Sequence, residues 1–456
     1  MIKLVIDPAF KQLEKKLSYV AGIFNDLYST DREVRIQYGA QGQCSISILP
    51  GNSLSFFENT WEKPREIIRV EWKRRSIPVF FTRTTPREVI SHNEAGKHVI
   101  INVDILSSAF YVLSCWQEYH SNAKDRLGRF PGKASILSEL KVINIPIVNY
   151  YFDILIKAIK ITTGVAPKKK YLQDYTFTVG LTHDIDLCNT GWKENVYKAI
   201  SSGNFISALK IISDKIKKKD IWYNFNTIHE IEKSLGVNSS FYFIPEHKKV
   251  GNVRNADYDI DSDDILNVMR LLRTAGFEIG IHGSFGSSTN HQKIQSEINK
   301  FPFPIKGGRF HYLDLDLPAS FEVIERSKLQ YDSSLGFADK PGFRSGLCNP
   351  YHPYDFRNDR AFSFIEFPLV IMDTTLINRK YNNYSVEEGV FIIKEIISEV
   401  KNFQGDLVLL WHNSSFSGPK YDRWRDVYIE IIDFCKKEGA FMGSIESILK
   451  YLQNNE

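Results

Sequence analysis

The sequence has few cysteines, no long apolar run and almost no bias in charge. Its five cysteines are odd in number, lie far apart and form no CxxC pair, which gives no support to a disulfide framework or a thiolate zinc site. No stretch of about eighteen apolar residues is free of charge, so no membrane-spanning helix is expected. The N-terminal segment MIKLVIDPAFKQLEKKL has charges where a signal peptide needs its apolar segment, which predicts a cytoplasmic protein.

The charge balance argues against a nucleic-acid partner. The 58 lysines and arginines oppose 54 acidic residues, which gives a net charge of +4 and is too weak a bias for a nucleic-acid-binding surface. Lysines do gather in LKIISDKIKKKD, residues 209–220. A solvated helix face explains most such clusters, and peripheral contact with anionic lipid or with a phosphorylated substrate is the alternative.

The chain contains enough apolar residues for more than one core. Of its 456 residues, 43% are hydrophobic and 25% are charged, which is typical of a globular protein with two or three domains. The segment ITTGVAPKKKYLQDY, residues 161–175, places glycine, proline and a lysine run between two patterned regions. We therefore predict an N-terminal domain over residues 1–165, with no role indicated, and a second domain over residues 171–456.

Both domains are predicted to be α/β. In the first, short β-rich stretches precede helical periodicity, as in VDILSSAFYVLSCWQEY. In the second, apolar runs such as TFTVGLTHD, FEIGIHGS and DLVLLWHNS alternate with helical segments, which indicates parallel βαβ units. Chemistry gathers at the carboxyl ends of such strands. The ionisable residues that recur there are His183, Asp184, Asp186, Glu246, His247, His282 and His412.

These residues stand in motifs that resemble those of the polysaccharide deacetylases, metal-dependent hydrolases built on a distorted (β/α) barrel. The motifs, spread over residues 171–451, are LTHDID, GIHGSFGSS, GGRFHYL and LVLLWHNSS. The resemblance implies a catalytic base at Asp184, a general acid at His412 and an arginine, Arg309, that orients the base and keeps it ionised. It also implies a divalent metal held by Asp186 and His282, and these ligand types suit zinc.

The third metal ligand is where the sequence departs from this family. The second metal histidine should lie four residues after His282, where Gly286 stands. The proline of the arginine motif is replaced by His311, and His183 is also foreign to the pattern. We expect His311, ahead of His183, to supply the missing ligand.

A subgroup associated with surface-glycan biosynthesis looks similar, including the stretches DSSLGFADKPGFR and LLWHNSSF. The N-terminal stretches SAFYVLSCWQEY and GRFP resemble the domain that precedes the deacetylase there. The similarity implies removal of an N-acyl (acetyl) group from an amino sugar, linked to a nucleotide, a lipid or a polymer, in surface-polysaccharide or lipopolysaccharide biosynthesis.

Three further residues are predicted to contact the substrate. The loop YDSSLGFADKPGFRSG, residues 331–346, contains Asp332 and Arg344, and Arg344 would bind a phosphate or carboxylate. Trp411 would stack on a sugar ring. An ordinary surface loop and a core aromatic residue are the alternatives.

The catalytic residues also have ordinary structural explanations. Asp184 and Asp186 could cap the helix that follows, and His282 could be a buried core histidine. Two other functions stay open: hydrolysis of another C–N bond in an amide or formamide, and carbohydrate binding by a catalytically silent protein that has lost its metal. The metal content would separate the enzyme from the binding protein.

Overall fold

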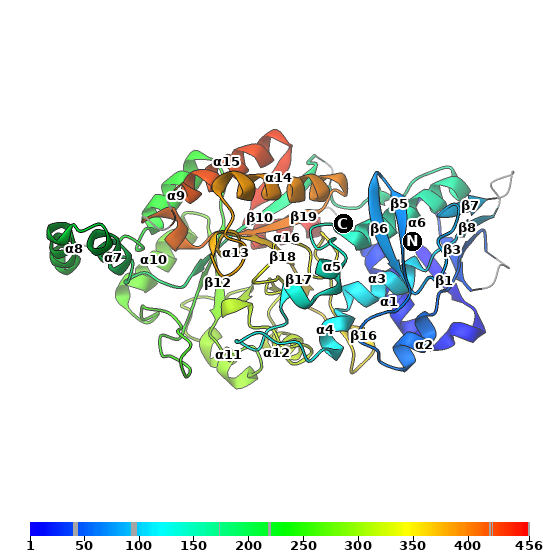
Figure 1. Ribbon diagram of the computed structural model, residues 1–456, viewed down its shortest axis with the longest axis horizontal. Helices are drawn as coiled ribbons and strands as arrows, with labels where there is room; N and C mark the ends of the chain where they lie inside the picture. Colours follow the sequence, from blue (N-terminus) through cyan, green and yellow to red (C-terminus); the bar gives the residue numbers. More distant parts are fainter. Residues whose placement is uncertain are drawn as a thin grey trace.

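Two sheets organise the chain in the computed structural model, which describes residues 1–39, 44–92, 98–172, 174–217, 220–418, 421 and 423–454. A five-stranded sheet belongs to the N-terminal part, and a nine-stranded sheet belongs to the second part. They lie side by side along the longest axis of the molecule, with the N-terminal sheet at the right of Figure 1.

The N-terminal sheet is mostly parallel and is packed by helices. Its elements are β1 (Ile2–Ile6), α1 (Glu14–Leu27), β2 (Tyr28–Ser29), β3 (Val34–Tyr38), β4 (Ile46–Ile48), α2 (Ser53–Glu58), β5 (Ile67–Trp72), β6 (Arg75–Phe80), β7 (Ile90–His92), β8 (Val99–Ile101), α3 (Ile105–Leu113), α4 (Trp116–His120), α5 (Ile136–Glu139), α6 (Ile147–Thr163) and β9 (Lys168–Lys169). The strand order is β1-β3-β4-β8-β7, in which β7 runs antiparallel to β8 and the other pairs are parallel. Helix α3 is buried along its whole length, because it lies between other elements of this core.

The second part is an incomplete parallel barrel. Its elements are β10 (Phe177–Ile185), α7 (Trp192–Ser201), α8 (Phe205–Lys217), α9 (Phe225–Ser234), β11 (Ser240–Phe243), α10 (Asp263–Thr274), β12 (Glu278–Gly283), α11 (His291–Ile298), β13 (Gly307–Phe310), α12 (Ala319–Ser327), β14 (Tyr331–Asp332), β15 (Tyr354–Asp355), β16 (Arg360–Ala361), β17 (Ile365–Glu366), β18 (Leu369–Met372), α13 (Asp373–Ile377), α14 (Val386–Asn402), β19 (Asp406–Leu410), α15 (Trp424–Lys437), β20 (Ala440–Gly443) and α16 (Ile445–Asn454). The strand order is β17-β14-β13-β12-β11-β10-β19-β18, with β20 also paired to β10. Two residues separate the edge strands β17 and β18, so the sheet must curl until its edges approach each other.

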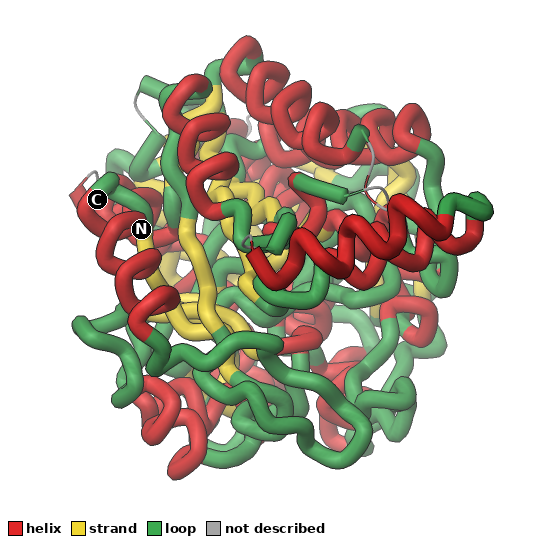
Figure 2. Tube along the Cα trace, turned by 90° about the vertical axis from the view of Figure 1, so that its left-hand side faces the viewer, coloured by secondary structure: helices red, strands yellow, loops and turns green. Residues whose placement is uncertain are grey.

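Helices cover the outside of this curled sheet (Figure 2). Every residue of β10 is buried, as expected for a parallel strand that is covered on both faces. Helix α14 shows why the sequence forms such a layer. Its residues Ile393, Ile396 and Val400 recur at helical spacing and are buried, and a capping box of Ser385 and Glu388 starts the helix. The prediction of an α/β chain whose second part forms a parallel β/α barrel-like sheet is confirmed at this level.

An insertion after β10 forms α7 and α8, and the lysine-rich stretch that starts at Leu209 begins within α8. The two helices pack mainly on each other and project from the body at the end opposite the N-terminal sheet (Figure 1). Within the described ranges, no helix is both long and apolar enough to cross a membrane.

The junction between the two parts is tightly packed. Strand β9, in the predicted linker, pairs with β2 of the N-terminal part. Buried polar contacts cross to the barrel: the Asn149 amide donates to Asn349 at 2.9 Å, and the Tyr150 hydroxyl donates to Glu399 at 2.8 Å. The domain boundary at residues 165–171 stays a prediction.

A buried ion pair also joins the parts. The Arg344 guanidinium donates through Nε to Glu118 at 3.0 Å and through a second nitrogen to the same carboxylate. Both side chains are buried, at 5% and 6% exposure. Arg344 is therefore a structural residue that fixes the loop after β14 to the N-terminal part.

Substitution Arg344→Met is expected to lower the free energy of unfolding by about 3–5 kcal/mol, because it leaves the Glu118 charge buried and unpaired. Urea unfolding measures this. The double variant Glu118→Gln/Arg344→Met should recover much of the loss, whereas Arg357→Met, which breaks an exposed pair with Glu322, should cost no more than about 1 kcal/mol. A double variant as unstable as the single one would contradict the assignment.

Candidate metal centre and active site

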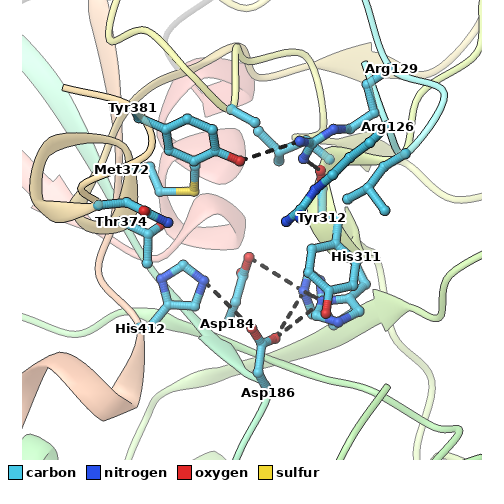
Figure 3. Close-up of a pocket in the computed structure, with 15 residues that line it drawn as sticks. Arg126, Arg129, Asp184, Asp186, His311, Tyr312, Met372, Thr374, Tyr381 and His412 are labelled. Atoms are coloured by element: carbon cyan, nitrogen blue, oxygen red, sulfur yellow. Dashed lines mark hydrogen bonds and ion pairs between the residues drawn. The ribbon is translucent and has the colours of Figure 1, made fainter. Parts of the chain in front are cut away.

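Six of the predicted residues meet at the carboxyl ends of the barrel strands. Parallel pairing places β10, β11, β12 and β13 side by side, with His282 in register with Arg309. A pocket opens at this edge, lined by five of the six, and Arg309 lies behind Asp184 (Figure 3). The six are Asp184, Asp186, His282, Arg309, His311 and His412.

Asp186, His282 and His311 form a compact cluster in this pocket. Asp186 Oδ1 lies 3.3 Å from His282 Nε2 and 3.4 Å from His311 Nδ1. The two ring nitrogens are 3.1 Å apart, and the three ligand atoms all lie within 4.8 Å of one another. One carboxylate oxygen and two imidazole nitrogens suit a zinc ion with positions left open for other ligands.

Hydrogen bonds on the far side of each imidazole identify the nitrogen that faces the cluster without a proton. His282 Nδ1 lies 2.9 Å from the carbonyl oxygen of Arg309, and His311 Nε2 lies 3.2 Å from that of Arg254. A carbonyl only accepts, so these nitrogens carry a hydrogen. In the neutral form that metal binding requires, each ring then turns a lone pair towards Asp186. Asp186 Oδ1 is buried and has no hydrogen-bond partner. Three acceptors that face one another without a donor fit a bound cation.

Asp184 is held beside this cluster by a buried arginine. Its Oδ1 accepts a hydrogen bond from Arg309 at 2.8 Å, and its Oδ2 lies 3.5 Å from His282 Nε2. Arg309 is 1% exposed and also donates to the carbonyl and hydroxyl oxygens of Ser333. The Arg309 guanidinium thus balances the charge of Asp184. The charge of Asp186 is left to bind a cation.

His412 stands across the Asp184–Asp186 pair from His311 (Figure 3). Its Nε2 lies 3.7 Å from Asp186 Oδ2, and its Nδ1 lies 2.7 Å from Asp373 Oδ1. Burial alone would lower the pKa of His412, but the charge and hydrogen bond of Asp373 raise it to about 10. The imidazole is therefore held in its protonated form at neutral pH.

The sequence interpretation missed Asp373. Its carboxylate also accepts hydrogen bonds from the Ser415 hydroxyl and the His412 amide. Burial would raise the pKa of Asp373, but the charge of His412 and these hydrogen bonds lower it. The signal was present, because Asp373 follows the apolar strand β18 directly.

The N-terminal part supplies one wall of the pocket. Arg126, Leu127 and Arg129 come from the loop before α5. Arg129 is fixed by Asp125, at 2.9 Å and 2.6 Å, and donates to the carbonyl of Tyr312. Arg126 points into the pocket (Figure 3) and has no ion pair among the described residues. The sequence marks DRLGRFPGKAS, residues 125–135, as a charged loop that could line a groove or simply be solvated. Its place in this pocket depends on how the two parts pack.

Arg344, Asp332 and Trp411 do not line the pocket, so their predicted contact with substrate is wrong. Arg344 is occupied by Glu118, as described above. Asp332 is buried and accepts hydrogen bonds from the Ser334 amide and hydroxyl, and burial raises its pKa. The side chains of Arg344 and Asp332 therefore bond to other buried residues rather than to a ligand in this pocket.

Trp411 is fully buried, with no exposed surface. Its ring packs against Trp424 and Tyr428, with centroid distances of 6.0 Å and 5.8 Å. The side chain points to the opposite side of the strand end from its neighbour His412, as the alternation of extended backbone requires. It cannot stack on a sugar in the pocket.

The other ionisable residues at strand ends have structural roles. His183 faces away from the pocket, where its Nε2 lies 2.8 Å from Glu232 Oε1, because side chains alternate along β10. The carboxylate of Glu246 accepts from the Lys248 amide, and the exposed His247 does not line the pocket. Gly286 sits in a turn with φ of +79°, where a histidine would be strained.

Comparisons with known proteins give distant similarities. A family of unknown function (DUF7033) matches residues 10–164, and no curated protein sequence matches the chain. Among solved structures, the chain is similar to a protein described as a polysaccharide deacetylase from Mycobacterium smegmatis, with 12% identity, a TM-score of 0.42 and coverage of 62% of this chain and 92% of that one.

Two further structures show the same level of similarity. The PuuE allantoinase has 10% identity, a TM-score of 0.44 and coverage of 64% and 96% of the two chains. A protein from Pseudomonas aeruginosa PAO1, also described as a polysaccharide deacetylase, has 10% identity, a TM-score of 0.43 and coverage of 65% and 97%. These likenesses are too distant to assign a function, which must be argued from the site itself.

His311→Ala and Asp186→Ala are expected to weaken zinc binding by at least about tenfold, because each removes a ligand atom of the cluster. Titration calorimetry with zinc on metal-stripped protein measures this, and the wild-type chain should bind about one equivalent. His247→Ala, which removes an exposed histidine, is the matched control. Equal zinc affinity in the His247 and His311 variants would exclude His311 as a ligand.

Proposed function

We propose that this protein is a metal-dependent hydrolase that removes the N-acetyl group of an amino sugar during surface-polysaccharide or lipopolysaccharide biosynthesis. The supporting observation is that an arginine-bound carboxylate and a carboxylate-bound histidine flank one metal-binding cluster. Asp184 lies beside His282, and His412 lies beside Asp186. Hydrolysis of an amide needs a proton acceptor for water and a proton donor for the leaving nitrogen, and these two groups can serve as such a pair.

The base in this mechanism is Asp184. A divalent ion in the cluster, zinc by its donor set, would polarise the acyl carbonyl and make water more acidic. Asp184 Oδ2 faces the same space and can accept the proton of the attacking water. Arg309 donates a hydrogen bond to the other oxygen at 2.8 Å, which fixes the direction of the carboxylate.

The acid is His412. Because Asp373 occupies its Nδ1, its Nε2 is directed towards the pocket. When the C–N bond breaks, Nε2 can give its proton to the nitrogen, so that the products leave as amine and carboxylate. Asp373 acts as a positioning residue that stabilises the imidazolium.

The substrate in this proposal carries a negative charge near the sugar. Arg126 faces the pocket without an acidic partner among the described residues, and Tyr312 and Tyr381 line the same pocket. A guanidinium in this position suits the phosphate of a nucleotide- or lipid-linked sugar. A polymer-linked amino sugar with an acidic neighbour offers the same chemistry.

Two other functions use the same pocket. Hydrolysis of another C–N bond, in an amide or formamide, would need the same base, acid and metal. A carbohydrate-binding protein without catalysis is favoured only if the metal site has been lost. Because His311 stands where a third ligand is needed, the absence of a histidine at Gly286 is no argument for that loss.

Asp184→Asn and His412→Gln are each expected to lower the rate of acetate release by about 10² to 10⁴, because each removes a proton-transfer group. Zinc-loaded protein should be assayed with UDP-N-acetylglucosamine and with N-acetylglucosamine oligomers. The zinc content of both variants should match that of the wild type. Binding of these sugars by zinc-loaded wild-type protein, with no acetate released, would support the carbohydrate-binding function instead.

Asp373→Asn is expected to move the alkaline limb of the pH–rate profile down by about one to three pH units. His412 must be protonated to act, so activity is lost as the pH rises through its pKa. Asp373, followed by Asp186 and Asp184, raises that pKa to about 10 from the ordinary 6.5. The measurement is kcat/KM between pH 5 and 11, with metal content checked at each end. Ser415→Ala, which removes a neighbouring hydroxyl but keeps the carboxylate, should leave the limb nearly in place. An unmoved limb in Asp373→Asn would remove His412 from the role of acid.

A further inference from the structure

The α7–α8 hairpin exposes apolar side chains to a degree seen nowhere else among the described residues. Six of the fifteen large hydrophobic residues that are exposed lie within it, although it spans only residues 192–217. This concentration exceeds what scattered exposed apolar residues produce on an ordinary surface. The six are Tyr197, Ile200, Phe205, Ile206, Leu209 and Ile212, with exposed fractions of 76%, 48%, 65%, 83%, 68% and 43%.

These side chains gather on one face of each helix. Phe205, Leu209 and Ile212 follow one another at spacings of four and three residues along α8, which places them in one row. Tyr197 and Ile200 have the same relation on α7. Since α7 and α8 pack mainly on each other and project from the body (Figure 1), neither the barrel nor the N-terminal part covers these rows.

The charge of the hairpin identifies the kind of surface that it fits. Residues 192–219 contain seven lysines and two acidic residues, a local excess of five positive charges in a chain whose net charge is +4. Lys210 and Lys215 lie on either side of the apolar row of α8 by helical geometry. Apolar side chains with lysines beside them are the pattern of a helix that lies in the interface of an anionic membrane.

We propose that the α7–α8 hairpin docks on the anionic surface of a lipid membrane, with its apolar rows in the interfacial layer and its lysines at the headgroups. The contact is peripheral, since no helix across the described ranges could span a bilayer. A protein partner or a second copy of the chain would need an acidic surface to match the lysines. The rest of this chain has an excess of only one acidic residue, because 52 acidic residues outside residues 192–219 oppose 51 basic ones.

The experiment is co-sedimentation of the full chain with vesicles of equal parts phosphatidylglycerol and phosphatidylcholine, and with vesicles of phosphatidylcholine alone. Wild-type protein should bind the anionic vesicles at least about tenfold more tightly, and raising the salt concentration should weaken that binding. Equal binding to both vesicles, or binding to neither, would overturn the proposal.

Two sets of variants assign the binding to the hairpin. Lys198→Glu/Lys210→Glu, at two exposed positions of the hairpin, is expected to lower the affinity for anionic vesicles by at least about tenfold. Lys157→Glu/Lys160→Glu, at two exposed positions of α6, should lower it far less. Phe205→Ser/Leu209→Ser should also reduce binding, and Leu271→Ser/Phe391→Ser, at equally exposed positions of 66% and 65%, should not. Circular dichroism and thermal melting verify that the variants are folded.

If the hairpin contacts a second copy of the chain instead of a membrane, the experiment gives a different result. If the wild-type chain dimerises in the absence of lipid and Phe205→Ser/Leu209→Ser makes it monomeric, the hairpin is a subunit interface and the proposal is wrong. The proposal is independent of the hydrolase function, because no residue of the hairpin lines the catalytic pocket. Vesicle binding would stand even if no acetate were released, and the loss of vesicle binding would leave hydrolysis of soluble substrates unchanged.

Discussion

A buried guanidinium organises the centre of the barrel. Arg309 reaches from β13 to Asp184 and Thr182 on β10 and to Ser333 after β14, with 1% of its surface exposed. A buried cation is tolerable only if its partners are charged or fully hydrogen-bonded. The carboxylate of Asp184 supplies the ion-pair partner of Arg309 inside the barrel, and its other oxygen faces the pocket. One interaction therefore links the barrel strands and sets the direction of a carboxylate in the pocket.

In the proposed metal cluster, two different sequence positions could supply the same ligand. The turn that contains Gly286 is directed away from the pocket, and the Gly286 amide donates a hydrogen bond to Asp314. His311 enters the same space from the end of the neighbouring strand β13 and lies 3.1 Å from His282. Adjacent strand ends in a parallel sheet are close enough for either one to supply a ligand. A motif that is read along the chain alone would count this site as incomplete.

The sequence predicted the strand ends well because the rule behind them is local. An apolar run followed by Asp184 and Asp186, or by His282, carries its own evidence, and the structure brings these residues into one pocket. Asp373 obeys the same rule, because it directly follows the apolar strand β18. The sequence could not predict which charged side chains would be buried as pairs. Arg344 and Glu118 are 226 residues apart, and no local pattern reveals that one will neutralise the other.

The order of the strands in the N-terminal sheet could not be predicted from the sequence either. Strands β4 and β8 have three residues each and pair across about fifty residues of chain. That part of the molecule nevertheless contributes to the catalytic pocket. Arg129 bonds to the carbonyl of Tyr312, the residue next to His311, and Arg126 and Leu127 form part of the wall. Changes in a loop from the first third of the chain can therefore alter which molecules enter the pocket. The ionisable side chains at the ends of the barrel strands would not have to change at all.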